Sequence, residues 1–228
     1  MDPTAGFATQ LADAARSMHG WASTQETLDR VVSVATELID GCDLVGISVV
    51  HRGGIDTPSA SDEVLRRIDE LQFELKEGPC YDALRTHETV CSRDLAVDER
   101  WPRWGPLVAA EVGAVSIVSF RLFTTADTLG ALNLYARKVD AFDEDDVYDG
   151  YALAAHVAVA LAASENVEQL ETAIVNRTVI GRAEGILMER FDITPAQAFA
   201  VLRRVSQRRN VRLYRVASEL VRTRQTPE

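Results

Sequence analysis

The chain has 228 residues, of which 46% are apolar and 26% charged, and its formal net charge is −11 at pH 7. This composition excludes a mostly disordered chain, and the net negative charge argues against a general nucleic-acid coat protein. No apolar run approaches the roughly 20 residues that span a bilayer, and no basic segment with an apolar core marks a signal peptide. We therefore expect a cytoplasmic protein without a membrane partner. Three cysteines without CxxC spacing argue against a disulfide scaffold or a zinc site: Cys42, Cys80 and Cys91.

The first 140 residues mix strand and helix patterns without a strict alternation. The helix candidates are residues 8–19, a segment that begins at Ser23 or Thr24 and ends at Gly41, residues 62–71, EGPCYDAL and the end of DERWPRWGPLVAAEVG. The strand candidates are residues 44–50 before a hairpin-like turn in HRGGID, the segment THETVCSRDL, and residues 115–123 and 129–136. Short turns between adjacent strands favour an antiparallel sheet flanked by helices, which is an α+β fold.

From Asp143 onward the sequence predicts one long helix that reaches about Arg190, and Gly181 or Gly185 are the positions where it could break. Seven residues in 3–4 spacing predict a coiled-coil dimer seam along this helix: Leu153, His156, Ala160, Ala163, Val167, Leu170 and Ile174. The open alternative is a helix that packs only on its own domain.

The last part of the chain has sharp helix boundaries. Thr194 and Gln197 form a capping box with a proline at the first helical position. The buried stripe of that helix is predicted at Phe199, Leu202 and Val205. A final helix is predicted to bury Leu213, Val216, Ala217, Leu220 and Val221. These helices and the end of the long one would form a three-helix unit whose core is thin.

Charge is divided unevenly along the chain. The last 61 residues contain 11 Arg, no Lys and 7 acidic residues, whereas the first 167 contain 13 basic and 28 acidic residues. This asymmetry favours two modules with different partners. The alternative is that arginine is frequent in the tail only because it is a good helix former.

The GxSxG, Walker A, HExxH and GxGxxG motifs are absent and the four histidines are dispersed, so we expect no catalytic residue. Asp143 to Asp146 are better explained by helix capping than by a metal ion. Cys80 lies near a predicted helix start that could lower its pKa, although a packing role is favoured. Trp101 and Trp104, beside Arg100 and Arg103, could stack on a base, but buried indole rings are favoured.

The strongest chemical signal is a group of arginines around the last helix–turn–helix junction: Arg203, Arg204, Arg208, Arg209, Arg212 and Arg215. Guanidinium groups bind phosphates through paired hydrogen bonds, so this group favours a nucleic-acid partner. Tyr214 lies off the buried stripe and could stack on an unpaired base. The open alternative is a solvated basic face.

The segment GRAEGILMERFDITPAQAFAVLRRVSQRRNVRLYRVASELV resembles the ANTAR domain. Upstream, EGPCYDAL, RDLAVDERWP and LGALNLYARKVDAFDEDD resemble the GAF domain that is fused to ANTAR in actinobacterial regulators. The resemblance implies a GAF-like sensor over residues 8–165, a coiled-coil connector helix over 143–180 and a three-helix ANTAR domain over 170–224.

The resemblance also implies a function. ANTAR proteins bind paired stem-loops with hexanucleotide loops in nascent RNA and suppress transcription termination, and a homodimer would supply one bundle for each loop. The residues expected to belong to the RNA-binding module are Arg182, Ala183, Gly185, Arg203, Arg204, Ser206, Gln207, Arg208, Arg209, Arg212, Tyr214 and Arg215. Glu184 departs from the pattern, because many ANTAR domains have lysine there.

Further expectations concern the sensor and the alternatives. The GAF pocket could hold a small molecule of unknown identity, but the N-K-F-D-E pattern of cyclic-nucleotide-binding relatives is absent, and no metal is expected. The sensor would bias the two output bundles through the connector helix. The alternatives are a DNA-binding helix-turn-helix regulator, a ligand-sensing module that docks a protein, and an enzyme that uses Cys80, such as a methionine-sulfoxide reductase.

Overall fold

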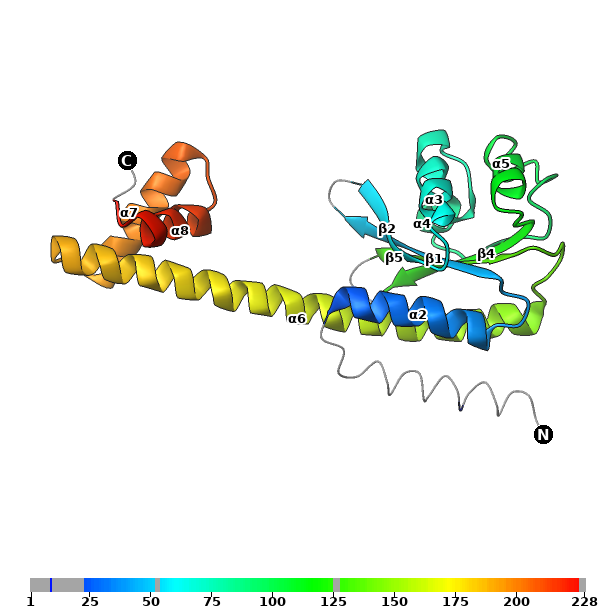
Figure 1. Cartoon of the computed structure of the whole chain (residues 1–228), viewed down its shortest axis with the longest axis horizontal. Coiled ribbons are helices and arrows are strands. Elements are labelled where there is room, and N and C mark those ends of the chain that lie inside the picture. Colours follow the sequence, from blue (N-terminus) through cyan, green and yellow to red (C-terminus); the bar gives the residue numbers. More distant parts are fainter. Residues whose placement is uncertain (1–8, 10–22, 52–53, 125–127, 226–228) are drawn as a thin grey trace. The chain divides into compact units, whose positions relative to one another are not determined.

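The computed structural model describes residues 9, 23–51, 54–124 and 128–225, so the helix predicted over residues 8–19 lies outside the described residues except at residue 9. The chain divides into two compact units, one that ends at Glu165 and one that begins at Asn166. Figure 1 shows both units.

The first unit is built on a five-stranded antiparallel sheet, which confirms the predicted α+β fold. The strands lie in the order β2-β1-β5-β4-β3. Their bounds are β1 Leu44–His51, β2 Gly54–Ala60, β3 Val90–Ser92, β4 Ser116–Phe123 and β5 Thr128–Ala136. The two central pairings run from Leu44 opposite Tyr135 to Val49 opposite Gly130, and from Ser116 opposite Ala136 to Phe123 opposite Thr128.

Helices cover both faces of this sheet (Figure 1). One face carries α2 (Thr24–Leu38) and the first part of α6 (Glu144–Phe191), and the other carries α3 (Val64–Leu75), α4 (Pro79–Thr86) and α5 (Trp104–Glu111). The Ser23 hydroxyl caps α2, as predicted. A Cβ added at Gly150 would lie 2.4 Å from the Phe120 ring, so α6 approaches the sheet this closely only because position 150 has no side chain.

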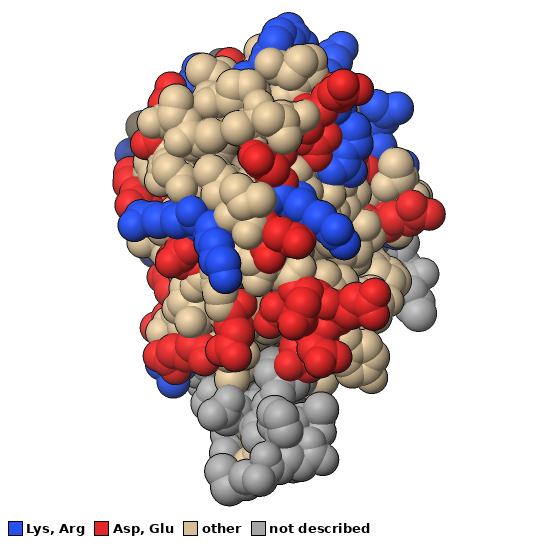
Figure 2. Space-filling model, turned by 90° about the vertical axis from the view of Figure 1, so that its right-hand side faces the viewer, with Lys and Arg blue, Asp and Glu red and all other residues tan. Residues whose placement is uncertain are grey.

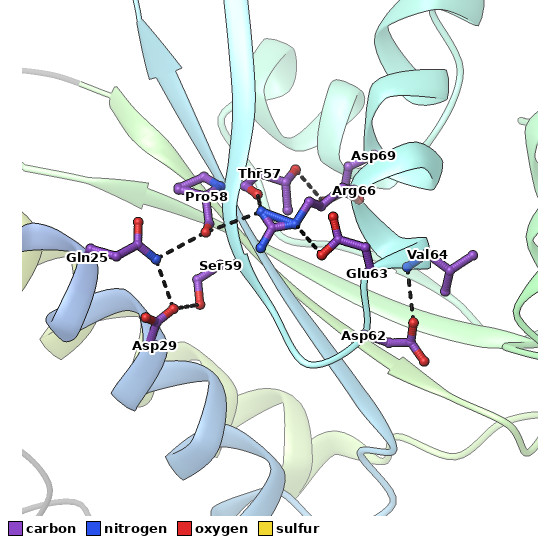
Figure 3. A network of polar contacts seen from close by, with 10 residues as sticks. All are labelled: Gln25, Asp29, Thr57, Pro58, Ser59, Asp62, Glu63, Val64, Arg66 and Asp69. Atoms are coloured by element: carbon purple, nitrogen blue, oxygen red, sulfur yellow. Dashed lines mark hydrogen bonds and ion pairs between the residues drawn. The ribbon is translucent and has the colours of Figure 1, made fainter.

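Strand β2 was not predicted, because its sequence GIDTPSA is polar and contains Pro58. Proline is tolerated in an edge strand, where one side of the backbone needs no partner. Side chains of both neighbouring helices hold β2 in place, as Figure 3 shows. From α2, Gln25 donates to the Pro58 carbonyl at 3.1 Å and Asp29 accepts from the Ser59 hydroxyl at 2.6 Å. From α3, Arg66 donates to the Thr57 carbonyl at 2.9 Å.

Helix α6 is continuous over 48 residues, so the sequence does not break at Gly181 or Gly185. An 18-residue window of α6 reaches a mean hydropathy of 1.2. By length and composition alone, this helix is therefore long and apolar enough to span a membrane. The core helix of a globular domain passes the same test, and Leu153, Val157 and Leu161 are buried in the core of the first unit.

The second unit packs the end of α6 against α7 (Pro195–Arg209) and α8 (Leu213–Thr223). The predicted capping box is present: the Gln197 backbone donates to Thr194 Oγ1, and the Thr194 backbone donates to Gln197 Oε1. Leu202 and Val205 lie in the core as predicted, and Ala198 takes the third position there instead of Phe199. Phe199 is 39% exposed, because it lies about 100° around the helix from Ala198.

Candidate nucleic-acid interface

A tight turn joins α7 to α8 and brings the predicted phosphate-binding residues to one junction. Asn210 ends α7 in the left-handed conformation, with φ of 50°. The Ser206 hydroxyl donates to the Val211 carbonyl at 2.6 Å, and the Val211 backbone N–H donates to the Ser206 carbonyl at 3.0 Å. Ser206 was predicted as an RNA-binding residue, but its hydroxyl group donates its hydrogen bond within the turn and stabilises it.

The outer face of α7 carries most of the predicted arginines. The buried stripe of this helix directs a set of polar residues outward, all of them exposed: Arg203, Arg204, Gln207 and Arg208. Arg209 differs, because its guanidinium forms an ion pair with Glu219 of α8 at 2.9 Å. The structure thus leaves three exposed arginines on α7 and uses a fourth to link α7 with α8.

Helix α8 begins at this junction with its first-turn N–H groups uncapped by any side chain. A helix N-terminus carries a partial positive charge and presents N–H donors, which makes it a favourable place for a phosphate. Arg212 and Arg215 flank it and are exposed. Tyr214 is partly buried and lies off the buried stripe of Val216, Ala217 and Leu220, as predicted.

The α6 residues of the predicted RNA-binding module have different surroundings. Arg182 is exposed, whereas Ala183 is completely buried in the core of the second unit and has no surface for a ligand. Ala183 therefore supports the module through packing. Gly185 is exposed, and a Cβ added there would have no neighbour within 4 Å. Its bare backbone leaves room for close approach by another molecule, and Glu184 beside it is partly buried.

The predicted dimer seam is exposed only along part of its length. Leu153 is completely buried in the core of the first unit, so its assignment to a seam is wrong. Ala160 is partly buried against the same core. The remaining predicted positions are exposed: His156, Ala163, Val167, Leu170 and Ile174. A 3–4 spacing of apolar residues does not distinguish a helix face turned toward its own domain from one turned toward a partner.

Inside the first unit lies a buried polar network that the sequence patterns did not predict. Asp69 of α3 is 1% exposed and accepts hydrogen bonds from four side chains: Ser48 Oγ at 3.1 Å, Thr57 Oγ1 at 3.0 Å, Tyr135 Oη at 2.8 Å and Gln72 Nε2 at 3.1 Å. Burial raises the pKa of Asp69, although these hydrogen bonds oppose the shift. Burial also raises the pKa of Tyr135 well above its usual value, so its hydroxyl remains a donor.

The network continues across the sheet and into α4. Ser119 donates to Asn133 at 2.7 Å, and Asn133 donates to Ser48 at 3.3 Å. Gln72 Oε1 accepts from the backbone N–H of Cys80 at 2.8 Å. The signal that could have revealed this network is the presence of polar residues at inward positions of otherwise apolar strands.

Cys80 does not have the surroundings of a reactive thiol. It is completely buried, and burial together with nearby Asp69 raises its pKa to about 12. A catalytic cysteine has a lowered pKa and access to solvent, so this geometry argues against the Cys80 enzyme alternative. Among the residues that the structure describes, no group of three or more His, Cys, Asp or Glu side chains is placed to hold a metal ion.

The tryptophan pair is a packing feature. Trp101 and Trp104 are 1% and 0% exposed, with their rings edge to face at 6.0 Å. Their indole N–H groups donate to Asp82 and to the Ile68 carbonyl. Neither ring is available for stacking on a base.

Comparisons with known proteins identify both parts of the chain. The GAF domain model matches residues 22–162, and the ANTAR domain model matches residues 168–221. No curated protein sequence matches the chain.

Solved structures of low sequence identity share the fold of the first unit. The GAF domain of a phosphoenolpyruvate-protein phosphotransferase from Coxiella burnetii has a TM-score of 0.59 and 14% identity, and the match covers 74% of this chain and 99% of that one. A GAF sensor protein from Burkholderia vietnamiensis has a TM-score of 0.56 and 13% identity, with coverage of 69% and 94%. Free methionine-R-sulfoxide reductase from Neisseria meningitidis has a TM-score of 0.55 and 18% identity, with coverage of 73% and 95%.

These likenesses show the fold alone, whereas the domain models cover nearly all of the described chain. The GAF model alone matches more than half of the residues. ANTAR is an RNA-binding antitermination domain, and GAF is a sensor domain. The chain belongs to the GAF domain family and has the architecture of a regulator in which a GAF sensor precedes an ANTAR domain.

Proposed function

We propose that this protein is a cytoplasmic transcription antitermination regulator that binds paired stem-loops with hexanucleotide loops in nascent RNA. The proposal assigns the sensor to residues 8–165, the connector to 143–180 and the RNA-binding bundle to 170–224. The observation that carries it is the α7–α8 junction, where exposed arginines lie on both sides of a tight turn and an uncapped helix N-terminus.

Each side chain at the junction has a chemical role in this proposal. Arg203, Arg204 and Arg208 on α7 bind phosphate oxygens, with Gln207 between them as a neutral hydrogen-bonding group. Arg212 and Arg215 hold a phosphate beside the α8 N-terminus. Tyr214 stacks on a base of the loop, since loop bases are unpaired and accessible. Arg209 contributes less than these arginines, because Glu219 engages its guanidinium.

The same proposal makes the protein a homodimer. Val167, Leu170 and Ile174 are 50%, 65% and 66% exposed along the connector, which is unusual for a solvated helix face. Covering them with the same helix of a second copy buries them and supplies two RNA-binding bundles for two loops. The continuous helix α6 belongs to both units, so the sensor acts on the bundles through it.

The test is a binding titration of the full chain against a two-stem-loop RNA at two salt concentrations. A one-loop RNA and a DNA duplex of equal charge serve as competitors. We expect preference for the two-loop RNA, and an affinity loss of about tenfold or more in the double variant Arg208→Ala, Arg212→Ala. The salt slope should fall by about 0.7 for each lost phosphate contact.

A matched control is the double variant Arg177→Ala, Arg222→Ala, which removes the same charge at two exposed arginines outside the junction. Equal losses in both double variants would show a general charge effect and would overturn the proposed site. Equal affinity for duplex DNA would favour the DNA-binding alternative.

A further inference from the structure

A groove lies between the end of β4 and helix α6, on the first unit. Its volume is about 410 Å³, which is within the range of small-molecule sites. Three alanines of α6, Ala154, Ala155 and Ala158, line it, and Ala154 and Ala158 are almost fully buried. Tyr151 and Val159 stand beside them and are 53% and 68% exposed. The small alanine side chains thus create a hollow among larger apolar groups.

The opposite wall of the groove comes from β4. Its pairing with β5 shifts register between Leu122 and Phe123, and such irregularities redirect side chains. Phe123 lines the groove and is 43% exposed. Apart from one charged side chain, carbon atoms dominate this lining, so the groove fits an aliphatic or aromatic body rather than a sugar or a nucleotide.

The one charged side chain is Arg121. Its guanidinium lies 4.8 Å from the centre of the Phe123 ring and donates from Nε and Nη2 to the Thr128 hydroxyl, with the Nε distance at 3.0 Å. Arg121 forms no ion pair with a carboxylate of the described residues, which include 23–51, 54–124 and 128–225. It is only partly exposed, so an anion that binds it is better shielded from water than on an open surface.

We propose that this groove binds a free aliphatic carboxylate, an anionic amphiphile of about ten carbons. The carboxylate lies against the unused N–H groups of Arg121, and the alkyl chain covers the alanine hollow between Tyr151 and Val159. Charge complementarity selects the head group, and burial of apolar surface supplies most of the affinity. The site is separate from the buried Asp69 network and from the arginines of the second unit, so it does not depend on RNA binding.

The experiment is a calorimetric titration of the full chain with decanoate, kept below its micelle concentration, and in parallel with the neutral 1-decanol. We expect saturable one-site binding of decanoate. Arg121→Gln retains a donor for Thr128 but removes the charge, so it should weaken decanoate binding about tenfold and leave decanol binding unchanged. Absence of saturable decanoate binding in the wild-type chain would overturn the proposal.

Ala155→Phe fills the groove from an exposed position and should abolish binding of both ligands. Its control is Ala110→Phe, which makes the same change at an exposed alanine of α5, on the opposite face of the sheet. Circular dichroism checks that both variants are folded. Equal binding by the two variants would place the ligand elsewhere and contradict the proposal.

Sedimentation velocity tests whether a second copy of the chain occupies the groove instead. With the ligand in the groove, Ala155→Phe should leave the sedimentation coefficient of the wild-type chain unchanged. A shift of Ala155→Phe to a smaller species, together with failure of decanoate to bind, would show that the groove is a contact between copies and would overturn the proposal.

Discussion

The two units of this protein place their polar chemistry in opposite locations. Among the residues that the structure describes, the sensor unit has cores of eighteen and ten buried apolar residues on the two faces of its sheet, and it encloses the Asp69 network within the second core. The described part of the C-terminal unit has one core of eight buried apolar residues and carries its arginines outside. Figure 2 shows the acidic side chains that gather on one face of the sensor end.

The difference in core size explains where each unit places its polar groups. The sensor can enclose polar groups because a large core offsets their desolvation and every member of the network has a partner. The C-terminal unit has little apolar surface to spare, and two of its eight core residues, Ala183 and Leu187, come from α6. Its stability therefore depends on α6, and its chemistry is confined to the surface.

The largest expected effect breaks the thinner core. Leu202→Ala removes a completely buried side chain and should lower the free energy of unfolding of the C-terminal unit by about 2–5 kcal/mol. Urea unfolding should then show an earlier transition for this unit. The transition of the sensor, which the fluorescence of Trp101 and Trp104 reports, should not change. Val175→Ala, at a position that is 55% exposed and outside the proposed dimer seam, is the control. If the transitions of both units shifted together to a lower urea concentration, the two units would unfold as one, which would contradict this prediction.

The next effect interrupts the helix that the two units share. Ala163→Pro should disrupt α6 at a cost of about 3 kcal/mol, because proline removes a backbone hydrogen bond and collides with the preceding turn. Under the proposed dimer, affinity for two-loop RNA should fall by about a hundredfold or more while affinity for a single loop changes little. Sedimentation and RNA titration measure this. Unchanged dimerisation and RNA binding would contradict the connector seam.

A third prediction concerns the pH dependence of the sensor. Burial raises the pKa of Asp69 above its usual value of 3.8, so the folded state holds this proton more tightly than the unfolded state. Its contribution to stability is complete below pH 3.8 and is lost as pH rises through the folded-state pKa. The difference in the free energy of unfolding between the wild type and Asp69→Asn should therefore decrease as pH rises from 3.8 through the folded-state pKa.

Asp98 provides the contrasting case within the same unit. Hydrogen bonds from Arg100 lower its pKa to about 2, so its contribution is present above pH 3.8 and is lost as pH falls toward 2. The difference between wild type and Asp98→Asn should therefore change with the opposite sign. Urea titrations from pH 2 to pH 8 measure both. The same sign for the two variants would contradict the assignment.

The smallest expected effect is on the surface of the C-terminal unit. The Arg209–Glu219 pair is about 40% exposed on each side, and such pairs stabilise by less than about 1 kcal/mol. Glu219→Ala should hardly change the thermal midpoint of unfolding, yet it frees the Arg209 guanidinium at the junction. RNA affinity should stay equal or rise up to about threefold. A tenfold loss would show that this pair positions the interface.

Much of the fold was predictable because strong local patterns agree with the tertiary structure. Residues 44–50, 115–123 and 129–136 are apolar and β-branched runs, and each forms a strand of the sheet. The Thr194–Gln197 capping box marks the start of α7 in the sequence as it does in the structure. The GAF and ANTAR motifs are confirmed by the domain models.

The parts that were missed depend on contacts between segments far apart in the sequence. Strand β2 has little strand propensity of its own and is held by side chains of α2 and α3. Leu153 fits a dimer seam by spacing, yet it faces the sheet. Ser206 and Arg209 have the right chemistry for RNA, but local partners engage them. The groove beside Arg121 has no sequence signature, because it depends on small residues that face an irregular strand end.

The close approach of α6 at Gly150 has a consequence for how this sequence can evolve. Even the smallest side chain at position 150 would collide with the ring of Phe120, which is 1% exposed and lies opposite Leu132 of β5. Substitutions at the two positions must therefore compensate for each other: a larger residue at position 150 requires a smaller residue at position 120. An alignment of sensors that attach this helix in the same way should show the pair as a covarying couple, and a library that randomises both positions should recover the same compensation.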